Sequence, residues 1–302
     1  MARSLIPPRS KRRVPSDSNT YLRTRPKLAV ITPLTRVDLP WVAEILGRPG
    51  LDETLFAAHL APRHLRLDQA AFILGNHFED TAYLSYLHVS VEMRRSGLAS
   101  RLVAAFIEAA RSAKLRRVLV SGETGKAPGY IQPGIEIPHE SGALELLHGF
   151  GFKELAKAYA MSFELKDAPT LSENDKWGVR LATDTDRAAL LEAIANSVPG
   201  EWEQFFTTAL TINESQIIIA IDGELIGGYC HTRGDRFGPI GVLPDFRGGG
   251  LGTLLAIAAL HEMRARGAKW ARFTWSDAEN LSFYQRIGFK TERCFQRMEL
   301  LL

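Results

Sequence analysis

A glycine-rich stretch constrains the fold of this 302-residue chain more than any other feature. Residues 237–242 form an apolar run that indicates a strand. Further on, apolar residues recur at the spacing of one helix face, at Leu251, Leu254, Leu255 and Ala258. Residues 247–252 therefore form a turn that leads into a helix N-terminus. The unpaired N–H groups of such a turn, with the positive end of the helix dipole behind them, favour phosphate or pyrophosphate.

Two common nucleotide-binding motifs do not fit this stretch. A P-loop requires Gly-Lys-Ser/Thr after its glycines, whereas this chain has Gly250-Leu251-Gly252-Thr253. The dinucleotide fingerprint requires G-x-G-x-x-G within a βαβ unit, and residues 248–252 meet its spacing only when the motif is shifted. The turn must therefore serve another phosphate-containing ligand.

The stretch contains Arg-x-x-Gly-x-Gly at Arg247, Gly250 and Gly252, preceded by Val242 and Pro244. It resembles the acetyl-CoA-binding motif of the GNAT superfamily of N-acyltransferases. About thirty residues later, residues 280–289 (Asn-Leu-Ser-Phe-Tyr-Gln-Arg-Ile-Gly-Phe) resemble the second signature of that superfamily, a helix with a tyrosine that ends in Gly-Phe. Two signatures in order are more specific than either alone.

The resemblance implies where acetyl-CoA would bind. Its pyrophosphate would lie on the turn next to Arg247, at the N–H groups of Gly248, Gly249, Gly250, Leu251, Gly252 and Thr253. The backbone of Val242 would hydrogen-bond the pantetheine arm. Asn280 is a further candidate contact, although many members have asparagine seven residues before the tyrosine, where this chain has Asp277. The family moves the acetyl group directly to an amine, without an acyl-enzyme.

Direct transfer requires two proton movements. The thiolate leaving group must be protonated, and Tyr284 is the predicted general acid; the alternative is an aromatic residue that packs beside Phe283 and Phe289. The amine must also lose a proton, because an alkylamine with a pKa of about 10.4 is almost fully protonated at pH 7. Candidate bases are His231, Asp235, Glu201 and Glu203, and Trp202 is a candidate wall of the acceptor site or a core residue.

The same strand, turn and helix pattern occurs earlier in the chain. Arg94, Gly97 and Ala99 repeat Arg247, Gly250 and Gly252 with an offset of 153 residues, and Gly151-Phe152 repeats Gly288-Phe289 with an offset of 137. The first copy thus contains about 16 extra residues, predicted as a loop within 122–134. The sequence therefore predicts an internal duplication, with Arg94, Gly97 and Ala99 as a second cofactor-binding turn.

The first copy lacks the predicted acid. Leu147 occupies the position of Tyr284. Tyr130 in the inserted loop is either a substitute or a packing residue, and His88 is predicted to be structural, on the opposite strand face from Val89. The first copy is therefore predicted to bind acyl-CoA without turnover, or to be purely structural or regulatory.

The domain boundaries follow from the repeat. We expect a basic arm at 1–26, an N-terminal GNAT-like domain at 27–166, a linker at 167–176 and a catalytic C-terminal domain at 177–302. Residues 1–27 have a net charge of +7, against −4 for the remainder, and the arm is interpreted as a disordered extension, with a transit peptide or a nucleic-acid-binding arm as alternatives. Cys230 and Cys294 are isolated, which favours a reducing compartment, the cytoplasm, and argues against a metal site.

The sequence thus predicts an α/β (α+β) protein of two tandem GNAT-type domains, each a mixed, mostly antiparallel sheet flanked by helices. Its layout is similar to that of mycothiol synthases. The predicted function is transfer of an acetyl group from acetyl-CoA to a primary amine, more plausibly of a small molecule than of a protein. The alternative is a non-catalytic acyl-CoA-binding or interaction protein. No membrane partner is expected, because no apolar run reaches the ~20 residues of a membrane span.

Overall fold

The computed structural model describes residues 30–46, 65–120, 132–138, 142–171, 176–197, 202–212 and 214–302. The basic arm, Tyr130 and Glu201 lie outside these ranges, as does the side chain of Glu203. The N-terminal half contains β1 (Ile31–Pro33), α1 (Leu39–Ile45), β2 (Leu65–Leu67), β3 (Ala71–Phe78), β4 (Thr81–Val89), α3 (Leu98–Ser112), β5 (Arg117–Val120), β6 (Ile135–Ile137), α4 (Ala143–Gly149) and β7 (Lys153–Glu164). The C-terminal half contains β8 (Gly178–Leu181), α5 (Arg187–Ser197), α6 (Glu203–Ala209), β9 (Gln216–Asp222), β10 (Leu225–Arg233), β11 (Arg236–Val242), α7 (Leu251–Ala265), β12 (Trp270–Phe273), α8 (Ala278–Ile287) and β13 (Lys290–Leu301).

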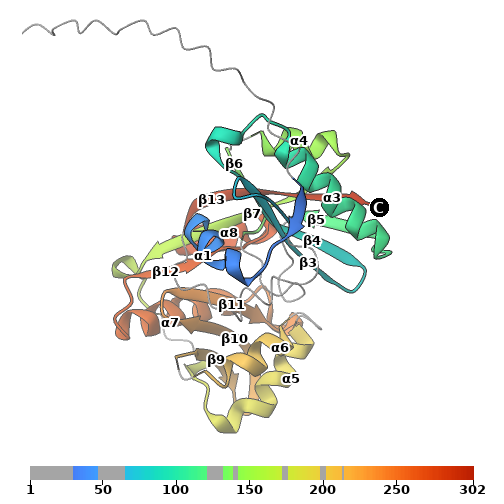
Figure 1. Cartoon of the computed structure of the whole chain (residues 1–302). Helices are drawn as coiled ribbons and strands as arrows, with labels where there is room; N and C mark the ends of the chain where they lie inside the picture. Colours follow the sequence, from blue (N-terminus) through green and yellow to red (C-terminus); the bar gives the residue numbers. More distant parts are fainter. Residues whose placement is uncertain are drawn as a thin grey trace, which may run out of the picture.

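The strands of both halves form one continuous sheet of 13 strands, in the order β1-β2-β3-β4-β5-β13-β7-β12-β11-β10-β9-β8, with β6 paired to β13 (Figure 1). Among the described strands, only β4 with β5 and β11 with β12 pair in parallel. The predicted mixed, mostly antiparallel architecture is therefore confirmed. The two sheets, however, are joined into one.

They are joined because the last strand of each half pairs with the other half. β13 lies beside β5, with Glu299 opposite Leu119, and β7 lies beside β12, with Ala271 opposite Phe163. β7 and β13 also pair with each other in the middle of the sheet. Figure 1 shows β13, in red, among the strands of the N-terminal half. Cutting the sequence between 166 and 177 therefore does not separate the two sheets.

The central β7–β13 pairing is symmetric. Residues 137 positions apart are equivalent in the two copies, so Lys290 corresponds to Lys153 and Glu299 to Ser162. Lys290 pairs with Ser162 and Glu299 pairs with Lys153, which is one contact seen from both copies. The two halves are thus related by an approximate two-fold axis, as in an isologous dimer interface.

Each copy buries its own apolar core against its sheet. Leu102 and Phe106 of α3 and Leu255 and Ala259 of α7 have no exposed surface, as expected for the apolar faces predicted from the sequence. A second cluster under α1 includes Phe72 and Val42, and α5 and α6 cover a third. Within the described part of the chain, no helix combines the length and apolarity needed to cross a membrane.

Candidate active site

In each half, two parallel strands begin side by side and then diverge. β4 and β5 pair from Thr81 opposite Arg117 to Leu84 opposite Val120, where β5 ends and β4 continues to Val89. β11 and β12 pair only at Arg236 opposite Arg272, and β11 continues to Val242. Beyond this point the continuing strand pairs with no parallel neighbour among the described strands. Its backbone can therefore hydrogen-bond an extended ligand in the gap.

The glycine-rich turn of the C-terminal half has the predicted geometry. Gly248 and Gly250 have φ values of 83° and 80°, a left-handed conformation that glycine adopts without strain. Gly250 caps α7, so the N–H groups of Leu251, Gly252 and Thr253 have no acceptor within the helix. These groups make the start of α7 suitable for an anion.

Arg247 determines how this turn is attached to its surroundings. Its Nε donates to the carbonyl oxygen of Val242 at 3.0 Å, and its Nη2 donates to the carbonyl oxygen of Ser197 at 3.3 Å. The side chain thus ties the turn to β11 and to the end of α5. The Val242 carbonyl, expected to contact pantetheine, already accepts one hydrogen bond and has one lone pair left.

Gly252 lies against an aromatic ring. A Cβ atom at this position would lie 3.3 Å from Cε2 of Phe283 and 3.6 Å from Cγ2 of Val242. The absence of a side chain at position 252 therefore leaves room for the Phe283 ring between α7 and β11.

Tyr284 lies where the two parallel strands diverge. Its ring centroid is 6.4 Å from that of Phe237 on β11 and 4.5 Å from that of Phe273 on β12. Phe283 and Phe289 complete its surroundings, with centroids 5.0 and 5.7 Å away. Burial among these rings raises the pKa of the Tyr284 hydroxyl above its ordinary value, and nearby Cys230 and Asp277 raise it further. The hydroxyl is therefore protonated at neutral pH.

Asp277 and Asn280 occupy the first turn of α8. Asp277 is the residue before the helix, its carbonyl accepts from the N–H of Asn280 at 3.1 Å, and its Oδ1 accepts from Nε1 of Trp275 at 3.1 Å. Both side chains are exposed. Asn280 and Tyr284 are four residues apart and share one face of α8, as predicted.

Both ring nitrogens of His231, one of the described base candidates, are occupied by hydrogen bonds. His231 is buried, with 2% of its surface exposed; its Nδ1 lies 3.1 Å from the Gly238 carbonyl and its Nε2 3.1 Å from Oγ of Ser215. Because a carbonyl can only accept, Nδ1 carries the proton and Nε2 accepts from Ser215. Burial, with Arg236 and Arg233 nearby, lowers the pKa of His231 to about 4 despite the Gly238 bond, so it is neutral.

The other acceptor-side candidates divide between surface and core. Asp235 is exposed and lies 3.5 Å from Nη1 of Arg272. Trp202 packs edge-to-face on Phe205, with centroids 5.7 Å apart, and belongs to the core under α5 and α6.

The N-terminal half repeats the site with different side chains. Gly97 caps α3 with φ of 85°, and Nε of Arg94 lies 3.5 Å from the Val89 carbonyl, as Arg247 does to Val242. Ala99 follows at the position of Gly252. Leu147, the counterpart of Tyr284, is buried and packs with Leu84 and Val120.

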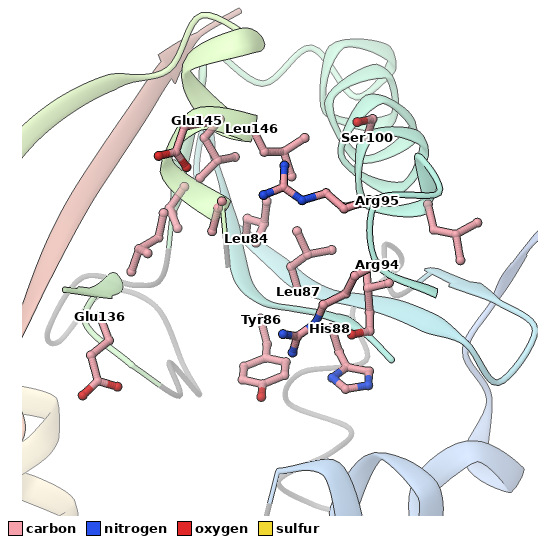
Figure 2. A pocket seen from close by; sticks show the side chains of 18 of the residues that line it. Leu84, Tyr86, Leu87, His88, Arg94, Arg95, Ser100, Glu136, Glu145 and Leu146 are labelled. Atoms are coloured by element: carbon pink, nitrogen blue, oxygen red, sulfur yellow. Dashed lines mark hydrogen bonds between the residues drawn. The ribbon is translucent and has the colours of Figure 1, made fainter. Parts of the chain in front are cut away.

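A pocket of about 640 Å³ occupies the cleft of the N-terminal half (Figure 2). Its lining combines the continuing part of β4, the turn before α3, the start of α4 and the β6 wall, and includes Tyr86, His88, Arg94, Arg95, Gly97, Ala99, Glu136 and Glu145. Figure 2 shows Tyr86 and His88 on the side of β4 opposite to Leu87. Sequence reasoning treated His88 as structural and did not select Tyr86, Arg95 or Glu136, because no motif marks them.

Two family models match the sequence at these two sites. The GNAT acetyltransferase domain model matches residues 213–291, and the GNAT acetyltransferase family model matches residues 63–127. Each half of the chain thus contains a GNAT domain, and the chain is a tandem of two such domains. GNAT domains transfer acyl groups. No curated protein sequence matched this chain.

Solved structures show the same fold at low identity. A region described as a GCN5-related glucosamine N-acetyltransferase, in a fungal multi-domain GH3 β-N-acetylglucosaminidase, aligns with a TM-score of 0.73 and 16% identity over 90% of this chain, which spans only 38% of that protein. A GCN5-related N-acetyltransferase from Sphaerobacter thermophilus aligns with a TM-score of 0.69 and 18% identity, over 90% of this chain and 95% of the other. A tandem GNAT protein from the clavulanic acid biosynthesis pathway aligns with a TM-score of 0.62 and 15% identity, over 90% of this chain and 98% of the other.

Proposed function

We propose that this protein transfers an acetyl group from acetyl-CoA to a primary amine of a small molecule, and that the reaction takes place in the C-terminal cleft. The observation that carries the proposal is the position of Tyr284, whose ring lies between Phe237 and Phe273 where the two parallel strands diverge. Because Cys230 and Cys294 are both unpaired, a reducing compartment such as the cytoplasm suits the protein.

The residues of the cleft suit acetyl-CoA as donor. The helix start at Gly250 offers N–H groups to the pyrophosphate, and the free stretch of β11 offers backbone groups to the pantetheine amides. Asn280 shares the α8 face of Tyr284 and would contact the donor from that side. In the N-terminal half, Arg94, Gly97 and Ala99 would hold a second acyl-CoA.

Tyr284 would protonate the thiolate as the carbon–sulfur bond breaks. Burial raises the pKa of its hydroxyl, and the same apolar surroundings would raise the pKa of a thiol placed beside it. The pKa of the proton donor, the tyrosine hydroxyl, and that of the proton acceptor, the thiolate, are thus raised together, and general acid catalysis requires the two to be close. The neutral amine forms a bond to the thioester carbon as the carbon–sulfur bond breaks. Its proton passes through water to the tyrosinate that Tyr284 leaves, so the products are an amide and free coenzyme A.

Isothermal titration of acetyl-CoA tests the donor site without knowledge of the acceptor. Gly250→Arg places a long side chain where the pyrophosphate would lie, and Gly97→Arg is the matched variant in the other half. We expect Gly250→Arg to remove the heat that belongs to the C-terminal cleft. If this variant binds acetyl-CoA as the wild type does, the C-terminal site is not the donor site and the proposal fails.

Tyr284→Phe tests the chemistry. A panel of primary amines, with glucosamine among them because of the fungal neighbour, is screened for release of free thiol from acetyl-CoA. With the best amine, Tyr284→Phe should lower kcat by roughly 10²–10⁴ and leave the KM for acetyl-CoA unchanged, because it removes only the acid. An unchanged kcat would show that the ring has a packing role only.

A further inference from the structure

The two clefts of this chain contain complementary halves of the acid–base chemistry. In the C-terminal cleft Tyr284 is the acid, but the two acceptor-side positions of β11 are Pro239 and Gly241, which cannot accept a proton. The equivalent positions of β4, 153 residues earlier, are Tyr86 and His88. The proton-accepting side chain that β11 lacks at these two positions is therefore present on β4.

A bulge in β4 directs Tyr86 and His88 to the acceptor side. The β3–β4 register shifts between the pairs Leu74–Tyr86 and Gly75–Leu84, which adds one residue to β4. As a result, Leu84 packs in the core under α3, whereas Tyr86 and His88 both stack on Phe72, with centroids 5.9 and 5.4 Å away. Leu87 and Val89 face the other side, so the pocket is lined from both faces of the strand.

His88 and His231 differ in the hydrogen bonds of their imidazole rings. Among the described residues no hydrogen bond engages the His88 ring, whereas both ring nitrogens of His231 are bonded. Burial, with Arg94 nearby, lowers the pKa of His88 below its ordinary value, so its imidazole is neutral at pH 7. A neutral ring with no hydrogen-bond partner among the described residues, on the wall of a pocket, can accept a proton.

β6 forms a further wall of the pocket and is held in place by β13. β6, which includes Glu136, pairs with β13, and Arg293 of β13 donates from Nε and Nη2 to the two oxygens of Glu136 at 2.8 and 2.6 Å. This bidentate pair fixes the wall and compensates the Glu136 charge. Glu136 is thus occupied by Arg293, whereas His88 is a neutral side chain of the lining that can accept a proton.

We propose that the N-terminal cleft is a second acyl-transfer site, in which His88 takes the proton of the attacking nucleophile on the acceptor side of β4. The nucleophile, an amine or water, forms a bond to the acyl carbon as the carbon–sulfur bond breaks. His88 receives the proton from the nucleophile and returns it to the thiolate. One histidine thereby serves both proton movements, and Leu147 needs no acidic group. The proposal does not depend on the activity of the C-terminal cleft.

Water as nucleophile allows a test without the natural acceptor. In a Tyr284→Phe background, which silences the C-terminal acid, release of thiol from acetyl-CoA is measured without amine. His88→Gln should lower this rate at least about 10-fold while acetyl-CoA binding is unchanged, because only the proton acceptor is lost. His148→Gln, which alters an exposed histidine of α4 outside the pocket lining, should leave the rate unchanged.

Chemical modification gives a second readout that needs no variant of His88. Diethyl pyrocarbonate acylates neutral imidazoles, and the modification of each histidine is followed by mass spectrometry. Acetyl-CoA should protect His88 but not His148, and Gly97→Arg should abolish the protection. Equal modification of His88 with and without acetyl-CoA, or equal thiol release in His88→Gln and its parent, would overturn the proposal.

Discussion

The two copies have the same turn before the helix but differ in a few side chains around it. The turn before each helix is the same: Gly97 and Gly250 both cap with positive φ, and Arg94 and Arg247 both lie against a strand carbonyl. Around it, Leu147 replaces Tyr284, and Arg95 has a φ of 61° where Gly248 has 83°. A non-glycine residue in this conformation is strained. The turn geometry is thus retained even where glycine is not.

His231 should make the stability of the protein depend on pH. Its pKa in the folded state is about 4, below the ordinary value of 6.5, so the unfolded chain binds a proton first as the pH falls. The contribution of the neutral histidine to the free energy of unfolding is complete above pH 6.5. It falls by about 3 kcal/mol in total as the pH is lowered from 6.5 to 4. Urea unfolding at pH 7 and pH 4.5 measures this loss. His231→Gln is the control, and a wild-type advantage that is equal at both pH values would contradict the prediction.

Gly252 and Phe283 should be energetically coupled. Alanine is the better helix former, by up to about 1 kcal/mol. In the wild type, however, its Cβ would lie 3.3 Å from the Phe283 ring, which must shift. The change in unfolding free energy caused by Gly252→Ala should therefore be less favourable in the wild-type background than in the Phe283→Leu background, by at least about 0.5 kcal/mol. A double-mutant cycle of unfolding free energies measures the coupling, and additivity of the two changes would refute it. The N-terminal copy already has this smaller pair, Ala99 and Leu146.

The residues of the turns and Tyr284 could be predicted because motifs mark them. Tyr86 and His88 could not, because their orientation depends on a bulge that strand alternation does not reveal. Phe283 was foreseen only as a neighbour of Tyr284. Its contact with Gly252 depends on how α8 packs on α7, which is a tertiary property.

At the element scale, β6 is a short strand that the sequence did not predict. The predicted loop lies within 122–134, mostly outside the described residues, and Ile135–Ile137 directly after it form a strand on β13. The contact is close, since a Cβ at Gly134 would lie 2.4 Å from the backbone oxygen of Gln296. Backbone cannot move aside as a side chain can.

Gly134→Ala should therefore displace β6 from β13. We expect faster hydrogen exchange at the amides of residues 135–137, because their pairing with β13 is weakened. Gly149→Ala is the matched control, because a Cβ there meets no atom within 4 Å. Unchanged exchange at β6 in Gly134→Ala would show that the strand adapts.

The strand that precedes the second glycine-rich turn and the helix face of α7 were predictable from periodicity. The exchange of β7 and β13 between the two halves was not predictable from the sequence. Both strands follow the same Gly-Phe pair, and nothing in either sequence indicates whether it pairs with β5 or with β12. Only the packing of the whole sheet decides between these neighbours.

At the scale of the whole molecule, the continuous sheet should make the two halves unfold together. β5 and β12 each pair with one strand of their own half and with one strand of the other half, β13 and β7 respectively. Calorimetry should show one transition whose calorimetric and van't Hoff enthalpies agree. Two separate transitions would show that the halves are independent.

A fragment that ends at residue 171 provides the complementary test. It retains β7 but lacks β13, so β5 becomes an open edge. We expect this fragment to be unfolded or to dimerise, with β7 of one copy beside β5 of the other. Analytical ultracentrifugation distinguishes these states from a folded monomer, which would contradict the role of the exchanged strands.

The symmetric register of β7 and β13 bears on the history of the gene. Two identical chains that exchanged their last strands around this axis, once fused end to end, would give the present arrangement. After such a fusion neither copy can be deleted, because each supplies a strand that the other requires. Selection for folding alone would then preserve both copies. The catalytic residues of one copy could change while the other copy kept the ancestral reaction.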